Sequence, residues 1–350
     1  MQRYFTDFLL GGGPESAGDS KIARIGEDGW AVRHVNAADS LYDAALHFVV
    51  VGSSSPCRDD RHPAVSELMS DLADGPLRVS LVHVALHDGR MVSSAAAIES
   101  PEGSGLVLIP CDATGPEQFT GTGLALRSLV LAAWSQSLDL LEVLIPSGQT
   151  RLADSLRFGG FRLLTELIYL ARPIDSGPNR NLSAASRPEL DWRTFSDATR
   201  ALFCEAVRRS YVQSMDCPEL TTIRTPEQAI TAHQATGVHD PGLWFVARQG
   251  GEPVGVLLLS SMRRQDALEI VYMGVAQDAR GTGVADALME RALESARLMS
   301  ATNLALAMDV RNLPARRFYG RWGFTRMAAR CAWIATPDSK VTWNHAGTFA

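Results

Sequence analysis

Two short glycine-containing sequences occur twice in this chain, in the same order. Gly-Thr-Gly-Leu-Ala at residues 121–125 matches Gly-Thr-Gly-Val-Ala at residues 281–285, 160 positions later. Arg-Phe-Gly-Gly-Phe at residues 157–161 likewise matches Gly-Arg-Trp-Gly-Phe at residues 320–324. Matches that agree in order and spacing indicate an internal duplication. The chain is therefore expected to contain two copies of one fold.

The length of 350 residues is too great for one compact core, which also favours two domains. Residues 173–188 are rich in Pro, Gly, Asn and Ser and lack an apolar period, which is typical of a linker. These features predict a first domain at residues 1–175, a linker at 176–188, a second domain at 189–337 and a tail at 338–350.

The hydrophobic periods of the second half predict an α/β domain. Strands are expected at residues 190–195, 243–247, 254–260, 268–275, 304–308 and 324–334. Helices are expected at residues 196–209, from residue 225, at 282–298 and at 312–321. The resulting order is β-α-α-β-β-β-α-β-α-β.

Charge and composition exclude several classes of function. The formal net charge of −6 and the absence of a basic tail argue against nucleic acid as a partner. No apolar stretch is long enough to cross a membrane, and the N-terminus lacks a signal-peptide core. The five cysteines are irregularly spaced, which predicts a reduced, cytoplasmic setting. His83 and His87 lack a third ligand nearby in the sequence, so no metal site is expected.

The segment between the strand at 268–275 and the following helix is the main candidate for chemistry. In Arg280-Gly281-Thr282-Gly283, the glycines allow the backbone to approach a ligand closely. The free N–H groups and the dipole of the following helix favour a bound anion, so this loop predicts a diphosphate site. A simple tight turn is the alternative. The third glycine of a Rossmann motif and the Gly-Lys-Ser/Thr of a Walker loop are both missing.

This loop and a segment downstream resemble the GNAT superfamily of N-acetyltransferases. Arg280, Gly283 and Ala285 fit its R/Q-x-x-G-x-G/A signature, which holds the pyrophosphate of coenzyme A. Residues 312–324 are similar to its N-x-x-A-x-x-hydrophobic-Y-x-x-x-G-F segment. The resemblance implies that Asn312 contacts the pantetheine arm and that Tyr319 protonates the departing thiolate. Backbone N–H groups would hold the diphosphate at Arg280, Gly281, Thr282, Gly283, Val284 and Ala285. A core aromatic is the alternative for Tyr319.

The strand before the loop resembles the corresponding strand of the histone acetyltransferase branch of that family. The resemblance implies that Glu269 is the general base. The backbone of Met273, Gly274 and Val275 would then pair with the pantetheine amide. An ammonium group with a pKa near 10 must lose a proton before it attacks a thioester, and a carboxylate can accept that proton. A solvated strand residue without a catalytic role remains open for Glu269, because many relatives use a chain of waters.

The region between the two helices of the acceptor side contains Asp216, Cys217 and Glu219. Asp216 and Glu219 are candidates to hold a cationic acceptor, either a small molecule or a peptide with a primary amine. Cys217 is a candidate for a covalent intermediate, but the family generally transfers the acyl group directly. A helix end interrupted by Pro218 is an equally good reading of the whole segment.

The first half departs from the signature where the chemistry needs it. Thr120 stands in place of the arginine, Gln149 in place of Asn312 and Leu156 in place of Tyr319. The strand at 104–109 has no carboxylate, although the Gly-Thr-Gly at 121–123 remains able to accept a phosphate. The first copy is therefore expected to be degenerate.

The resemblance as a whole implies two tandem GNAT folds, each a mixed, mostly antiparallel twisted sheet flanked by helices. It implies an acetyl-CoA-dependent N-acetyltransferase that acts by direct attack in a ternary complex, with acetyl-CoA as co-substrate and no metal. A non-catalytic sensor or scaffold that binds acyl-CoA is the alternative. The identity of the acceptor, the acyl chain length and the oligomeric state are not encoded in any pattern of the sequence.

Overall fold

The computed structural model describes residues 23–25, 29–52, 63–73, 75–174, 188–235, 238–262 and 266–338. The predicted linker and tail, and Cys57, lie outside these residues apart from Pro188 and Asp338. The chain divides into two compact units. Of the described residues, the first unit comprises those from 23 to 164 together with 331–338, and the second comprises those from 165 to 330. Two units agree with the duplication in the sequence, and the domain boundaries drawn from the sequence remain predictions.

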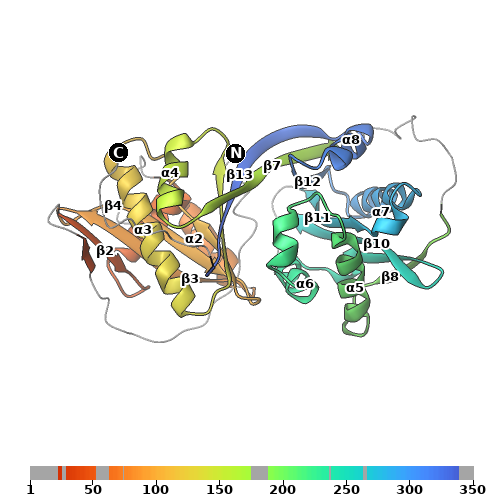
Figure 1. The fold of residues 1–350 in the computed structure, drawn as a ribbon, viewed down its shortest axis with the longest axis horizontal. Coiled ribbons are helices and arrows are strands. Elements are labelled where there is room, and N and C mark those ends of the chain that lie inside the picture. The colour runs from red at the N-terminus through yellow and green to blue at the C-terminus, as the bar shows by residue number, and fades with distance from the viewer. Residues whose placement is uncertain are drawn as a thin grey trace. The chain divides into compact units, whose positions relative to one another are not determined.

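The first unit is a mixed sheet with helices (Figure 1). Its strands pair in the order β1-β2-β3-β4-β5-β6, antiparallel throughout except between β5 and β6. The strands are β1 (Ala23–Ile25), β2 (Trp30–His34), β3 (Arg78–His87), β4 (Arg90–Glu99), β5 (Ser104–Leu108) and β6 (Leu140–Pro146). The helices are α1 (Tyr42–Val50), α2 (Pro63–Ala73), α3 (Pro116–Ser135) and α4 (Thr150–Phe158).

The second unit repeats this plan (Figure 1). Its strands are β8 (Asp191–Thr194), β9 (Trp244–Gln249), β10 (Glu252–Met262), β11 (Ala267–Val275) and β12 (Asn303–Asp309), and only β11 and β12 pair in parallel among these. Its helices are α5 (Arg200–Tyr211), α6 (Pro226–Gln234), α7 (Val284–Leu298) and α8 (Leu313–Arg321). Short 3-10 helices precede several of these elements at Asp197–Thr199, Pro218–Thr222, Pro241–Leu243 and Gln277–Ala279. Every strand and helix predicted for this half is present, with ends that move by a few residues.

Alternating residues of β10 separate two apolar layers in the second unit. Val256 and Leu258 are buried with Phe203 of α5 and Ile230 of α6. Leu257 and Leu259 are buried on the opposite face, with the inner sides of α7 and α8. This alternation is the period of two expected for a strand buried on both faces. The site can therefore form only where the strands separate or end.

The last strand of each copy serves both units. β7 (Arg162–Pro173) begins in the first unit and continues from Thr165 in the second, whereas β13 (Thr325–Ala335) begins in the second and ends in the first. In the second unit β7 pairs antiparallel with β12, from Pro173 opposite Asn303 to Leu167 opposite Asp309. The strand that closes the first copy in sequence is thus part of the second unit.

The strand registers correct one expectation about the duplication. Ser104 pairs with Leu140 in the first unit and Ala267 pairs with Asn303 in the second, so both partners are displaced by 163 positions. The Gly-Thr-Gly match, displaced by 160, is therefore not a structural equivalence. Helix α3 already begins at Pro116, so residues 121–123 lie inside it and are buried. The expectation that they form a phosphate loop is wrong, because backbone N–H groups inside a helix bond to its own carbonyls.

Two observations concern the predicted absence of a membrane span and of a metal. Within the described ranges, no helix is long and apolar enough to cross a membrane. The same ranges contain no group of three His, Cys, Asp or Glu residues placed to hold a metal ion. His83 is buried instead, with Nδ1 at 2.9 Å from the Ser128 hydroxyl.

Candidate functional site

The loop before α7 has the backbone that its glycines predict. Gly281 and Gly283 have φ angles of +80° and +92°, a region that favours glycine. Gly283 is the N-cap residue of α7 and has no side chain to cap the helix. In the described part of the chain, no group accepts a hydrogen bond from the backbone N–H of Gly283, Val284 or Ala285. The helix therefore presents free donors and the positive end of its dipole at this loop.

Arg280 points away from these donors. Its guanidinium donates to the carbonyl oxygens of Ser210 at 3.0 Å, Val212 at 2.8 Å and Gln213 at 3.0 Å. These are carbonyls that the end of α5 leaves without helical partners. Arg280 thus joins the end of α5 to the loop, and its charge lies beside the loop.

β11 and β12 stop pairing before this loop. Their parallel pairing runs from Ala267–Asn303 to Ile270–Leu306, and no further pair follows among the described residues. On its other side β11 stays paired with β10 as far as Val275, with a bulge between Leu258 and Leu259. The β12-facing edge of Met273, Gly274 and Val275 therefore has no paired strand in the described structure and can accept a strand-like group, although the Val275 carbonyl accepts a hydrogen bond from Arg280 Nε at 3.3 Å.

Gly274 is required by the close approach of α5. A Cβ atom at this position would lie 2.5 Å from the Ser210 Oγ and 2.6 Å from its Cβ. Ser210 donates to the Val207 carbonyl at 2.7 Å and is 2.7 Å from the hydroxyl of Tyr272. Burial raises the pKa of Tyr272, so its phenol remains protonated and can donate to Ser210. These contacts fix the open edge of β11 against α5.

Asn312 and Tyr319 lie at the two ends of α8. The Asn312 side chain caps the helix by accepting the Ala315 N–H at 3.1 Å. Tyr319 is 7% exposed and contacts the rings of Phe318 and Phe324. Burial raises the pKa of Tyr319, and the nearby Asp216 carboxylate raises it further. A phenol kept protonated in this way can donate a proton to a thiolate.

Asp216 connects the acceptor-side loop to the end of β12. Its residue surface is exposed, but Oδ1 turns inward and accepts the Asp309 N–H at 2.8 Å. Desolvation of the carboxylate and the charge of Asp309 raise the pKa of Asp216, although a hydrogen bond from Asn312 acts in the opposite direction. Asp216 therefore lies close to Asn312 and Tyr319, and its role in binding the acceptor remains a prediction.

Glu219 is engaged by an arginine. Its carboxylate accepts two hydrogen bonds from Arg311, at 2.6 and 2.9 Å, and this ion pair lowers the pKa of Glu219. The same guanidinium donates to Asp309 at 2.7 Å. A carboxylate already paired in a bidentate manner attracts a cationic acceptor less than Asp216 does. The substrate-binding role of Glu219 remains a prediction.

Glu269 lies in the part of β11 that is still paired on both sides, opposite Ser260 of β10 and Ala305 of β12. Its side chain is half-buried. Burial raises the pKa of Tyr169 on β7 to about 12; the charge of Glu269 adds to this shift, and Arg330 opposes it. Glu269 is thus close to the β7 side of the sheet, and its role as general base remains a prediction.

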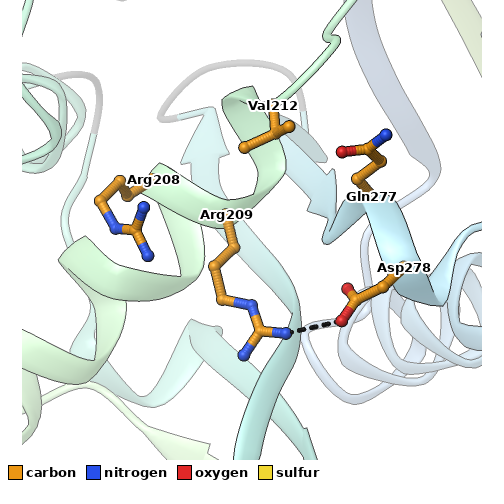
Figure 2. Close-up of a pocket in the computed structure, with 5 residues that line it drawn as sticks. All are labelled: Arg208, Arg209, Val212, Gln277 and Asp278. Carbon is orange, nitrogen blue, oxygen red and sulfur yellow. Dashed lines mark hydrogen bonds and ion pairs between the residues drawn. The ribbon is translucent and has the colours of Figure 1, made fainter.

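A hollow of about 530 Å³ opens beside the loop, between the end of α5 and the turn before Arg280 (Figure 2). It is lined by Arg208, Arg209, Val212, Gln277 and Asp278. Arg209 is already paired with Asp278 at 2.9 Å and with Glu252 at 2.6 Å. None of the predicted site residues lines this hollow, so it flanks the loop and is not the catalytic cleft.

The features described above all lie between residues 206 and 324. They are the ends of β11 and β12, the N-terminus of α7, and α8 with Asn312 and Tyr319. A family model described as the acetyltransferase (GNAT) family matches residues 206–324, from within α5 to just before β13. The second unit contains a GNAT-family acetyltransferase domain. The recognition made from residues 280–285 and 312–324 is thereby confirmed.

Similarity to known proteins extends over both units. A mycothiol acetyltransferase from Streptomyces griseus is 28% identical over 301 residues, which cover 84% of this chain and 92% of that protein. A GCN5-related N-acetyltransferase from Sphaerobacter thermophilus superposes with a TM-score of 0.54 at 20% identity, covering 88% of this chain and 96% of that one. A tandem GNAT protein from the clavulanic acid biosynthesis pathway gives 0.51 at 14% identity, with 88% and 98% covered. The predicted tandem GNAT fold is confirmed, and the similarities support N-acetyl transfer as the class of activity.

Several residues of the site escaped the sequence analysis. They are Thr165, Ser210, Tyr272, Asp309 and Arg311. Asp309 and Arg311 directly follow a buried strand, and polar residues at the carboxyl end of a parallel strand are a usual sign of a site. Thr165 and Ser210 carried no such sign, because their partners are far away in the sequence.

Proposed function

We propose that this GNAT protein transfers an acetyl group from acetyl-CoA to a primary amine by direct attack in a ternary complex. The observation that carries the proposal is the open edge of β11 leading to the free N–H groups of α7. A pantetheine arm is strand-like, and a diphosphate suits a helix N-terminus. Tyr319, whose raised pKa keeps its phenol protonated, belongs to the same apolar cluster as Met273, Val275 and Val284.

In the proposed reaction Glu269 takes a proton from the acceptor ammonium. The amine nitrogen then attacks the thioester carbonyl carbon, a C–N bond forms and the C–S bond breaks. Tyr319 donates its proton to the departing sulfur, and its phenolate then takes the second proton that the attacking nitrogen loses on becoming the neutral amide. The donors of Gly283, Val284 and Ala285 hold the diphosphate, while Asn312 and the edge of Met273–Val275 hold the arm.

The acceptor side favours a cation. Asp216 is an exposed residue whose carboxylate has, among the described residues, no arginine partner and accepts the Asp309 N–H through Oδ1, whereas the carboxylates of Glu219 and Asp309 are both paired with Arg311. The mycothiol acetyltransferase relative makes small amines the first candidates. Peptide N-termini and lysines complete the panel.

Release of free thiol from acetyl-CoA tests the proposal. We expect release that depends on one member of an amine panel made of amino sugars, amino acids, lysine peptides and the acceptor of the Streptomyces relative. Glu269→Gln and Tyr319→Phe should each slow it, typically by about 10²–10⁴-fold. Acetyl-CoA binding in calorimetry without thiol release on any amine would instead favour a sensor. Unchanged turnover in both variants would overturn the assigned roles.

A further inference from the structure

Thr165 is the one residue of β7 whose side chain reaches the carboxylate behind the acceptor loop. Its hydroxyl donates to Asp309 Oδ1 at 2.8 Å, and the two residues are 144 positions apart. Both are buried, Thr165 at 4% and Asp309 at 0% exposed. Thr165 belongs in sequence to the final strand of the first copy, yet it lies in the same compact unit as Asp309.

Asp309 is hydrogen-bonded to two consecutive residues of the acceptor loop, Asp216 and Cys217. Its Oδ2 accepts the Cys217 N–H at 3.1 Å, and its own N–H donates to Asp216 Oδ1 at 2.8 Å. Cys217 has a φ of +43°, which a residue with a side chain adopts only when its surroundings hold it there. The loop conformation that places Asp216 therefore depends on the orientation of the Asp309 carboxylate.

That orientation is set from two sides. Arg311 donates to both oxygens from its Nε, and its backbone N–H donates to Oδ1 at 2.8 Å. The Thr165 hydroxyl is the donor that comes from a different strand. Without it, the carboxylate is held only by Arg311 and by the N–H of the Cys217 loop that it is meant to orient, and the guanidinium is itself shared with Glu219.

We propose that Thr165 is a positioning residue for the acceptor amine, acting through Asp309 on Cys217 and Asp216. The inference rests on the amine acetylation proposed above. It gives the degenerate first copy a role at the site of the second, because its last strand supplies the hydroxyl. Among the described residues, no hydrogen bond joins Gly281–Gly283 to this network. Its contact with the coenzyme side is Asn312, which bonds to Asp216 but is also held by its own cap of the Ala315 N–H. The KM of acetyl-CoA should therefore not change with the orientation of Asp309.

Steady-state kinetics of the whole chain test this role. Thr165→Val keeps the shape of the side chain and removes the hydroxyl, whereas Thr165→Ser keeps the hydroxyl. Because a buried acceptor loses its donor, we expect Thr165→Val to raise the KM of the amine about tenfold or more, with the KM of acetyl-CoA unchanged. Thr165→Ser should restore the amine KM. Thr325→Val is the matched control, since Thr325 is exposed and its hydroxyl bonds only to the Ala171 carbonyl of β7.

A second measurement separates this inference from the proposed function. Amide hydrogen exchange at Cys217 should be faster in Thr165→Val than in Thr165→Ser, whether or not an acceptor amine is known. Equal exchange in the two variants would overturn the positioning role. So would a rise in both KM values together in Thr165→Val. If none of the amines in the panel supports thiol release while exchange at Cys217 still differs between the two variants, only the proposed reaction is contradicted.

Discussion

Asp216 and Asp309 hold one another in a reciprocal arrangement. The Asp309 N–H donates to the Asp216 carboxylate, and the Asp309 carboxylate accepts the N–H of the residue after Asp216. The two environments move the pKa values apart. Burial and the neighbouring charge raise the pKa of Asp216, whereas for Asp309 the effect of burial is outweighed by the hydrogen bonds of Arg311, Thr165 and Cys217, so its pKa is lowered. Pairs of this kind are typical of functional sites.

Asp309→Asn should remove a contribution to stability that depends on pH. A carboxyl group with a lowered pKa in the folded state stabilises it above the unfolded value of about 3.9, and the contribution is lost as the pH falls through the native value. The difference in unfolding free energy between wild type and variant should therefore be largest at neutral pH and shrink in acid. Asp216, with its raised pKa, acts in the opposite sense.

Urea denaturation at a series of pH values measures this difference. Asp154→Asn is the control, because Asp154 forms an exposed ion pair with Arg157 at 2.7 Å. Such a pair contributes about 0–1 kcal/mol at any pH. If the difference in unfolding free energy between wild type and Asp309→Asn stays constant from neutral to acid pH, the ionised carboxylate of Asp309 does not stabilise the fold.

Tyr319→Phe should change the pH profile of kcat as well as its size. Because burial and Asp216 raise the pKa of Tyr319, the wild-type rate should fall only above the ordinary tyrosine value of about 10. The variant should lose this fall at high pH and retain a slower, pH-independent rate there. The test is the pH dependence of kcat measured at saturating acetyl-CoA. If the variant keeps the wild-type profile, another group donates the proton to the departing thiolate.

Gly281→Ala should weaken binding of acetyl-CoA without a steric clash. A Cβ at Gly281 would meet nothing within 4 Å, but its φ of +80° is left-handed. That conformation costs an ordinary residue about 1–2 kcal/mol, which predicts a rise of about 5- to 30-fold in the KM of acetyl-CoA. Gly320→Ala, in α8 and equally open, is the control and should leave KM unchanged. Equal values for the two variants would mean that the loop backbone is not needed for binding.

Gly121→Ala, in the first unit, should lower the stability of the fold and leave acetyl-CoA binding unchanged. Here a Cβ would lie 2.8 Å from Val92 Cγ2 and 3.2 Å from the Ser93 Cβ. Crowding of this kind lowers the unfolding free energy by about 1–3 kcal/mol. We expect a lower midpoint of thermal unfolding and an unchanged KM for acetyl-CoA. A specific loss of acetyl-CoA binding would restore the first copy as a binding site.

Local sequence patterns predict the elements of the second unit and the backbone conformation of its loop. Thr225 caps α6 and Gln228 reaches back to it, as the Thr-Pro-Glu-Gln pattern predicts. Gly283 takes the left-handed backbone expected between a strand and a helix. These features depend on residues a few positions apart, so local preferences suffice to predict them.

Only the tertiary structure decided which Gly-Thr-Gly forms a loop and which residues complete the site. In the first unit Pro116 begins the helix, and the Gln118 side chain accepts the Thr114 N–H at 2.9 Å. Gly121 lets α3 pack closely on β4, and Gly123 lets it pack closely on α4. The same letters therefore lie in a helix in one copy and in a loop in the other. Asp216 meets Asp309 across 93 positions, and Thr165 meets it across 144. Contacts of this range depend on the order in which strands assemble, which no local pattern encodes.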